Sequence, residues 1–416
     1  MPADRFKHHD TAGSIYVHVL ASSLLIAIIG LASLSAVRLQ MRSSRLMRDY
    51  DEARTCAVSA VELGMLYVKQ DPNWRTTRPN GIWVQDEPLG AGRFTLEGID
   101  PADNLLSDSK YEPLVLTGTG MKGLARHKVQ VTLVPVIKPL EALNTSLHAC
   151  GLVHIKAGKQ IRAVGGPIST NGQLDNEGVL DGDAAAQSVN RTGTITGTFT
   201  MPAPAKRMPD ATVITSYMNK ATPIPYLATI DKAVLAPGSN PWGPTDPNGL
   251  YSIDTNGADL LIKNTRICGT LVVRAVGRTV TLDGAVFLQN YRSSFPTLVV
   301  EGNVVIKYSS CDLLLSEAAN AANYNPVGAP YEGVTDADML DVYPNEIRGL
   351  VHIKGSLTLQ QSARIVGAVI CDGSVTGEEA NTIAHDDSLY ACPPDGYTFV
   401  DQMQISPRSW KQVIDP

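Results

Sequence analysis

The most extreme hydrophobic pattern in the chain lies near its N-terminus. The 23 residues from Ile15 to Val37 contain no Asp, Glu, Lys or Arg. At about 1.5 Å per residue, a helix of this length crosses a hydrocarbon layer of roughly 30 Å. A cleavable signal peptide has an apolar stretch of only about 7–15 residues, and a soluble helix needs apolar residues on one face only. We therefore expect a single membrane-spanning helix.

The pattern predicts that this helix continues to about Lys69, because no proline occurs between Ser14 and Pro72. Apolar or small residues then recur every three or four positions and share one face. This stalk stripe consists of Leu46, Tyr50, Ala53, Ala57, Val61 and Gly64. It packs either against the chain's own globular part or against the same helix of partner subunits, and the sequence leaves both open.

Positive charges flank the apolar run on both sides. Arg5 and Lys7 precede it, and four arginines follow it between Arg38 and Arg48. Taken alone, this count places the C-terminal side in the cytoplasm. The four arginines, however, recur every three or four residues, as on the solvent-facing side of a helical stalk. The count therefore does not decide the orientation.

Together these features resemble the N-terminus of minor type IV pilins and type II secretion pseudopilins, especially PilX-like minor pilins. The resemblance covers residues 5–70 and rests on a polar leader ending in Gly13, an apolar helix starting at Ser14, and the segment AVSAVELGM from Ala57 to Met65. It implies that a prepilin peptidase cleaves between Gly13 and Ser14. It also implies a bacterial inner-membrane protein with a cytoplasmic N-terminus, a periplasmic or extracellular body, and helix contacts with other pilin subunits.

One position departs from that family. Its major subunits carry a glutamate five residues into the mature chain, where this chain has His18. By resemblance, a subunit without this glutamate caps an assembly or serves only as a membrane anchor.

The sequence after the helix predicts β structure. Turn formers fill residues 71–90, and apolar and polar residues alternate in the runs that follow, up to Val136. We therefore expect a small antiparallel sheet within residues 71–138, lying on the stalk helix. By resemblance, this unit corresponds to a pilin head.

A repeated motif characterises the rest of the chain. The hexapeptide GLVHIK occurs at 151–156 and again at 349–354, with short apolar runs between the copies separated by Gly, Asn or Asp. Three such runs make a coil of about 20 residues, typical of a β-solenoid. We predict a right-handed parallel β-helix over 148–375, with insertions at 200–248 and 316–347 and a C-terminal cap or tail at 376–416. A β-sandwich is the alternative, but it does not explain the repeat.

Composition and charge narrow the function. The chain has 416 residues, a formal net charge of −6 and no long basic block. Nucleic-acid binding needs clustered Lys and Arg, so we expect no nucleic-acid partner. Aromatic residues make up only 6%, which suits a narrow core of Val, Ile and Leu. This composition also resembles the polymer-forming β-helices related to bactofilins.

Three groups of carboxylates are candidates for catalysis or metal binding, because β-helices that hydrolyse polysaccharide need converging acids. All three lie in turn-rich contexts, where aspartate is favoured for turning the chain. We therefore predict no catalytic, cofactor or metal site. The groups are Asp181 with Asp183, Asp254 with Asp259, and Asp336 with Asp338 and Asp341.

The histidines and cysteines of the sequence form no pattern typical of a catalytic or metal-binding site. His154 and His352 occupy the same place in the repeated hexapeptide, which predicts equivalent, solvent-facing positions. The six cysteines form no metal-binding pattern.

The cysteine pairing stays open. Cys56 is the expected free thiol, while Cys311 with Cys392, or Cys150 with another cysteine, are possible disulfides. Cys268 and Cys371 each follow an isoleucine, which predicts buried, equivalent positions in different coils.

The sequence favours a membrane-anchored, pilin-like structural protein of the bacterial envelope, without enzymatic activity. Its role is then that of a minor subunit or tip of a type IV pilus or type II secretion pseudopilus, displaying the β-helix for adhesion or assembly. The alternative is a membrane-tethered β-helix that binds or cleaves surface polysaccharide. A self-assembling solenoid scaffold is a third hypothesis.

Overall fold

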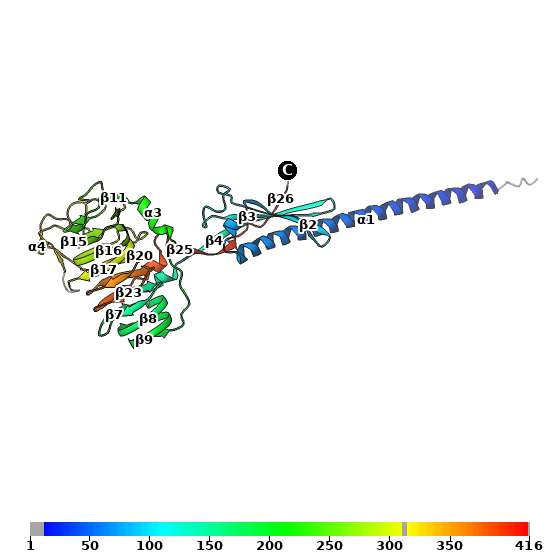
Figure 1. Cartoon of the computed structure of the whole chain (residues 1–416). Coiled ribbons are helices and arrows are strands. Elements are labelled where there is room, and N and C mark those ends of the chain that lie inside the picture. Colours follow the sequence, from blue (N-terminus) through cyan, green and yellow to red (C-terminus); the bar gives the residue numbers. More distant parts are fainter. Residues whose placement is uncertain (1–11, 310–313, 415–416) are drawn as a thin grey trace, which may run out of the picture. The chain divides into compact units, whose positions relative to one another are not determined.

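A computed structural model describes residues 12–309 and 314–414 (Figure 1). The chain divides into two compact units. The first, which we call the head unit, comprises residues 1–137 and 400–416, and the second, the solenoid unit, comprises residues 138–399. The solenoid unit is thus an insertion in the sequence of the head unit.

Helix α1 (Ala12–Gln70) is continuous over 59 residues. From residue 15 to residue 48 its side chains are exposed on every side. Farther along, the small side chains of Ala53, Ala57 and Ala60 are fully buried against the head sheet. The uninterrupted helix agrees with the absence of proline between Ala12 and Gln70.

The head sheet is antiparallel, as the alternating pattern predicts. Strands β1 to β4 pair in sequence order, and β25 and β26 from the C-terminus add to β4. A short helix α2 (Trp74–Thr77) precedes the sheet. The strands are β1 (Gly81–Leu89), β2 (Gly92–Ile99), β3 (Leu114–Lys122), β4 (Ala125–Pro139), β25 (Thr398–Ile405) and β26 (Lys411–Val413).

Two glycines of β3 let the helix approach the sheet closely. A Cβ atom on Gly120 would collide with the carbonyl oxygen of Ala53, and one on Gly118 would collide with that of Ala57. Leu116, on the same side of β3, is buried in the same core. The head core therefore depends on small residues on both the helix and the strand.

The coils of the solenoid unit consist of parallel strands, each paired with strands one coil away; a separate antiparallel pair, β18 (Leu315–Ser316) with β19 (Val342–Tyr343), lies outside the stack. The coil repeat is 16 residues from Ile168 to Ala184 and 18 residues from Ile347 to Ile365, close to the predicted length. Its strands are β5 (Leu147–Ala149), β6 (Val153–Ile155), β7 (Gln160–Val164), β8 (Ile168–Asp181), β9 (Ala184–Ile195), β10 (Phe199–Thr200), β11 (Thr222–Ile224), β12 (Thr229–Asp231), β13 (Val234–Leu235), β14 (Leu250–Asp254), β15 (Leu260–Cys268), β16 (Thr270–Gln289), β17 (Leu298–Tyr308), β20 (Ile347–Ile353), β21 (Leu357–Leu359), β22 (Arg364–Cys371), β23 (Val375–Gly377) and β24 (Asn381–His385).

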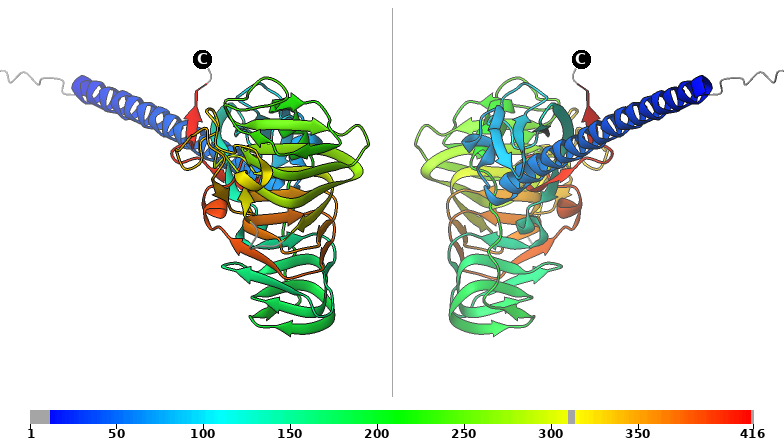
Figure 2. Two further views of the ribbon diagram at one scale, coloured as in Figure 1. Left: turned by 90° about the vertical axis from the view of Figure 1, so that its left-hand side faces the viewer. Right: turned by 90° about the vertical axis from the view of Figure 1, so that its right-hand side faces the viewer.

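The coils do not stack in sequence order. Strands β22, β23 and β24 pair with β5, β6 and β7, so the last coil lies beside the first. The chain winds outward through β8 and β9, crosses to the far end, and returns through β11 to β24. Figure 2 shows the orange coils between the blue-green and the yellow-green ones.

Two predicted boundaries are therefore corrected. Residues 200–248 are not a simple insertion, because they carry the crossover and the end-coil strands β11, β12 and β13. Residues 376–416 are not a cap or tail: β24 is a solenoid strand, and β25 and β26 belong to the head sheet.

An outer layer covers one face of the solenoid. It consists of η1 (Glu141–Asn144), α3 (Thr212–Lys220), α5 (Ser388–Ala391) and the following residues to Phe399. These segments bury outward-facing side chains of the coils, including Val272, Val299 and Ile370. Strands apolar on both sides are expected where both faces of a sheet are covered.

The outer layer overturns the prediction for the two histidines. His352 pairs with Ile370, which in turn pairs with His148, so its counterpart in the stack is His148 and not His154. His154 lies on another face, in register with Thr376. His352 is only 2% exposed, and its Nδ1 lies 3.0 Å from the hydroxyl of Tyr397. Identical hexapeptides thus occupy different faces of the solenoid.

Candidate functional site

The exposed part of α1 is the first candidate functional region, as a membrane-spanning segment. The helix is long and apolar enough to cross a membrane, judged by length and composition. The predicted processing residues Gly13 and Ser14 lie in its first turns, and residues 1–11 of the predicted leader lie outside the described residues. His18 follows within the same helix.

The stalk stripe divides into two parts. Ala53, Ala57 and Val61 are fully buried on the chain's own sheet, and a Cβ atom on Gly64 would lie 3.0 Å from Leu116 Cδ1. The rest of the stripe is exposed, by 51% at Leu46 and 41% at Tyr50. Own-sheet packing therefore accounts for the C-terminal part of the stripe, whereas Leu46 and part of the Tyr50 side chain stay exposed.

An aromatic contact marks the point where α1 leaves the sheet. The hydroxyl of Tyr50 lies 3.0 Å from His127 Nδ1, and the two rings meet edge to face with centroids 5.2 Å apart. The same hydroxyl accepts a hydrogen bond from Gln412 Nε2 at 3.2 Å. Burial, and secondarily the charge of Arg54, lowers the pKa of His127. This contact joins α1 to β4 and to the C-terminal strand.

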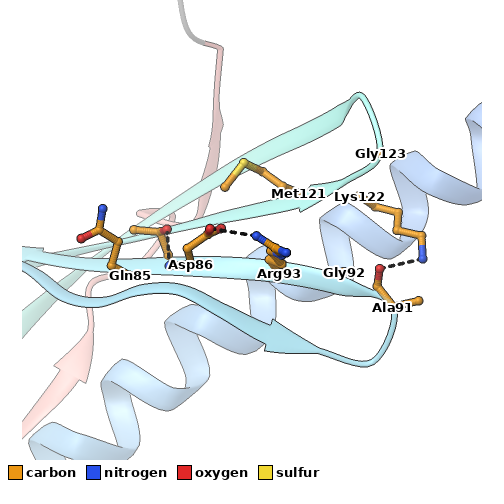
Figure 3. A pocket seen from close by; sticks show the side chains of 9 residues that line it. Gln85, Asp86, Ala91, Gly92, Arg93, Met121, Lys122 and Gly123 are labelled. Atoms are coloured by element: carbon orange, nitrogen blue, oxygen red, sulfur yellow. Dashed lines mark hydrogen bonds and ion pairs between the residues drawn. The ribbon is translucent and has the colours of Figure 1, made fainter.

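A cleft of about 510 Å³ lies beside the hairpin turns of the head sheet (Figure 3). Its charged side chains are already paired. Arg93 Nη1 lies 3.1 Å from Asp86 Oδ2, while Lys122 Nζ donates to the Ala91 carbonyl at 2.7 Å and lies 3.0 Å from Glu52 Oε2 on α1. The residues that line the cleft include no histidine or cysteine, so the cleft offers neither as a nucleophile or base.

Two of the three carboxylate groups form hydrogen bonds that stabilise turns and link neighbouring coils, as their turn-rich sequence context suggests. Asp181 accepts a hydrogen bond from Thr196 Oγ1 at 2.8 Å, and Asp183 from the backbone N–H of Thr198 at 2.7 Å. In the second group, Asp254 accepts from Asn256 N at 2.9 Å, and Asp259 accepts from Thr279 N at the same distance.

The third group is partly brought together. Asp336 and Asp341 lie close to each other and to Glu317. Asp338 instead caps its own loop by accepting a hydrogen bond from Leu340 N at 3.0 Å. Glu317 was not among the predicted residues. Its position at the start of an Ala-rich stretch gives little indication in the sequence that it meets Asp336 and Asp341.

The described cysteines form no disulfide: Cys56, Cys150, Cys268, Cys371 and Cys392 are free thiols. The predicted pairing of Cys392 with Cys311 cannot be placed, because Cys311 lies outside the described residues. Burial raises the pKa of Cys56 and, to about 12, that of Cys371.

The prediction that Cys268 and Cys371 are equivalent is wrong. Cys268 is half-buried and pairs with Gln289, whereas Cys371 is buried and pairs with Ile353 and Ala149. The two thiols therefore lie on different faces of the solenoid.

His148 is the most perturbed histidine among the described residues. It is fully buried beneath the outer layer, with Nδ1 2.8 Å from Ser169 Oγ. Its Nε2 has no hydrogen-bond partner among the described residues. Burial, and secondarily the charge of Lys206, lowers its pKa from 6.5 to about 4. The folded chain therefore keeps this imidazole neutral.

This shift predicts acid-sensitive stability. The unfolded chain takes up a proton near pH 6.5, so the stability linked to His148 is complete above that pH and is lost as the pH falls toward 4. Urea unfolding of the His148→Gln variant should show about 2 kcal/mol less loss between pH 8 and pH 5 than wild type. Lys206→Gln should keep most of the wild-type loss, because burial is the main cause. Parallel profiles for wild type and His148→Gln would contradict the assignment.

Comparisons with known proteins give only weak likenesses. No protein-family profile and no curated relative matches the chain. Among solved structures, the competence-associated pilin ComZ from Thermus thermophilus matches with 12% identity and a TM-score of 0.27, over 88% of this chain and 98% of ComZ.

Ice-binding proteins also match. The LeIBP protein of an Arctic yeast has 12% identity and a TM-score of 0.28, over 58% of this chain and 91% of LeIBP. An ice-binding protein domain of Shewanella frigidimarina has 13% identity and a TM-score of 0.24, over 60% of this chain and 98% of that domain. These scores are too low to assign a function. The chain itself shows a long apolar N-terminal helix, an antiparallel sheet packed on it, and an inserted parallel β-solenoid.

Proposed function

We propose that the chain is a membrane-anchored, pilin-like structural protein of the bacterial envelope, and that it is not an enzyme. The observation that carries this proposal is α1, which is exposed and apolar over residues 15–37 and packed on an antiparallel sheet from Ala53 onward. A helix exposed on every side over an apolar stretch of this length needs lipid or other helices around it. The solenoid is then the part displayed outside the membrane.

In finer detail, we propose a minor subunit or tip of a type IV pilus or type II secretion pseudopilus, of PilX-like kind. The support is the sequence resemblance over residues 5–70, with His18 in place of the family's glutamate. The N-terminus is then cytoplasmic, and Leu46 together with the exposed side of Tyr50 faces neighbouring pilin subunits. The solenoid serves adhesion or assembly, with surface polysaccharide as the ligand class. We also propose right-handed winding, since crossovers between parallel strands are right-handed in nearly all proteins.

The mature N-terminus tests this proposal. The full chain, co-expressed with a prepilin peptidase and recovered from membranes, should begin at Ser14 in intact-mass and N-terminal peptide measurements. Gly13→Val should remain uncleaved, because the family's peptidase cuts after glycine. The matched control Gly30→Val, at a glycine where no atom lies within 4 Å of the added carbon, should be processed normally. An intact Met1 in the presence of active peptidase, or a start near Val37, would overturn the pilin assignment.

A further inference from the structure

Three carboxylates converge in the segment between β17 and β20, on the solenoid unit. Glu317, Asp336 and Asp341 each offer one oxygen, and these oxygens all lie within 4.8 Å of one another. Glu317 opens the short helix α4 (Glu317–Asn320), and Asp341 immediately precedes β19 (Val342–Tyr343). We call these three residues the acidic triad.

Glu317 is held rigidly at the base of the triad. It is fully buried, and its Oε1 accepts hydrogen bonds from the Tyr343 hydroxyl at 2.9 Å and from the Tyr324 backbone N–H at 2.5 Å. Its Oε2 accepts from the Asp341 backbone N–H at 3.1 Å. All three donors are neutral, so none of them balances the charge of the triad.

A buried amide beside the triad points to a ligand. Asn325 is 1% exposed, and its Nδ2 donates to Asp336 Oδ2 at 3.1 Å and to Asp341 Oδ2 at 2.9 Å. Its Oδ1 has no hydrogen-bond partner among the described residues, and neither has Asp336 Oδ1. A buried amide oxygen without a donor destabilises the folded state, because it has lost its hydrogen bonds to water. A half-turn of the amide would aim this oxygen at the carboxylates, an arrangement that only a cation between them would favour.

The charged side chains around the triad also favour a bound cation. The nearby Arg266 guanidinium donates its hydrogen bonds to the backbone carbonyls of Tyr324, Ala329 and Pro330. Its charge acts on Glu317 only at longer range, and in the described part of the chain the ion pairs of Lys and Arg go to other carboxylates than the triad. The triad therefore repels itself in the absence of a cation.

A second acidic group, in the head unit, differs from the triad because it contains a positive charge. It surrounds an arginine, whose Nη1 lies 3.6 Å from Asp100 Oδ2, so that its charge is partly balanced by the protein. The group consists of Asp100, Asp103, Asp108 and Glu112 around Arg75.

We propose that the acidic triad and the Asn325 carboxamide oxygen bind a calcium ion. The donors are all oxygens, with no histidine or cysteine, which selects a hard cation. Calcium accepts six to eight oxygens in flexible geometry, with carboxylates bound through one or both oxygens, whereas magnesium demands near-ideal octahedral geometry. The ion would tie α4 to the loop that ends at Asp341, with water completing its shell. This site is independent of the proposed pilin role.

Calorimetry and thermal unfolding on the full chain test the site. Protein purified in detergent with EGTA and then freed of chelator should bind one calcium ion per chain when titrated with CaCl2, and its Tm should rise. MgCl2 should bind at least about tenfold more weakly. The absence of both heat and Tm shift up to roughly 10 mM CaCl2, the upper range of extracellular calcium sites, would overturn the proposal.

Matched variants separate a calcium site from a merely acidic loop. Asp341→Asn and Asp336→Asn should each raise the Tm of the metal-free protein, because they relieve repulsion, and should weaken calcium binding at least about tenfold. Asp338→Asn, the same change at an exposed residue of the same loop, should bind calcium like wild type. The proposal fails if Asp341→Asn and Asp336→Asn keep the wild-type calcium response, or if Asp338→Asn loses it.

Discussion

Replacement of Gly120 by valine is expected to separate α1 from the head sheet. The new Cβ would meet the Ala53 carbonyl oxygen and lie within 3 Å of the Ala57 nitrogen and Cys56 Cβ, most of which is backbone that cannot turn away. Overpacking of this kind costs about 3 kcal/mol, more than the small gain in strand propensity of valine over glycine. Hydrogen exchange of the full chain should therefore accelerate at residues 53–64 and in β3.

The control is Gly30→Val, in the exposed part of the same helix, where no atom lies within 4 Å of the added carbon. Exchange in β3 should be unchanged in this variant. Exchange in the solenoid core, for example at 298–306, should be unchanged in both variants, because these residues belong to the other compact unit. Equal protection of residues 53–64 in Gly120→Val and wild type would mean that the close approach contributes little to the head.

The sequence predicted the elements whose signals are local. The helix follows from an apolar run and the absence of proline, and the head sheet follows from alternation along consecutive strands. The solenoid was indicated by short apolar runs with coil-length spacing. Each of these patterns depends only on residues that are close in the sequence, so it could be recognised without knowledge of distant contacts.

The order of the coils was not predictable in this way. Every coil presents similar inward-facing Val, Ile and Leu side chains, so nothing local indicates that β5 pairs with β22 and β8 rather than with β8 alone. The buried state of His352 likewise depends on Tyr397, 45 residues away. In the acidic triad, Asp336 and Asp341 were candidates from their clustering, whereas Glu317 lies 24 residues before Asp341 and joins it only through folding.

Replacement of Arg266 by methionine is expected to release the segment 317–343 from the solenoid. Arg266 points outward from β15 but is fully buried beneath that segment. Its guanidinium donates to the carbonyls of Tyr324 at 2.6 Å and of Ala329 and Pro330 at 2.7 Å. It also lies over the rings of Tyr331 and Tyr343, 5.3 and 5.6 Å from their centroids.

Methionine fills similar space but leaves three carbonyl oxygens without this donor, two of them in buried hydrogen bonds. The loss of one partner of a buried charged network costs about 3–5 kcal/mol. Limited proteolysis of the full chain should therefore cut Arg266→Met within 317–343 at least tenfold faster than wild type, by the conversion of about 1.4 kcal/mol per factor of ten. Arg266→Lys, which keeps the charge but not the planar fork, should fall between the two.

Arg278→Met provides the matched control, because Arg278 is exposed at a turn of the same solenoid, and it should be cut like wild type. If Arg266→Met resists cleavage as well as wild type does, the aromatic cluster of Tyr324, Tyr331 and Tyr343 would be sufficient to hold the segment. The expected result instead assigns Arg266 the role of joining a long excursion of the chain to the stack of coils. This excursion carries the acidic triad, so the calcium affinity of Arg266→Met should fall together with its protease resistance.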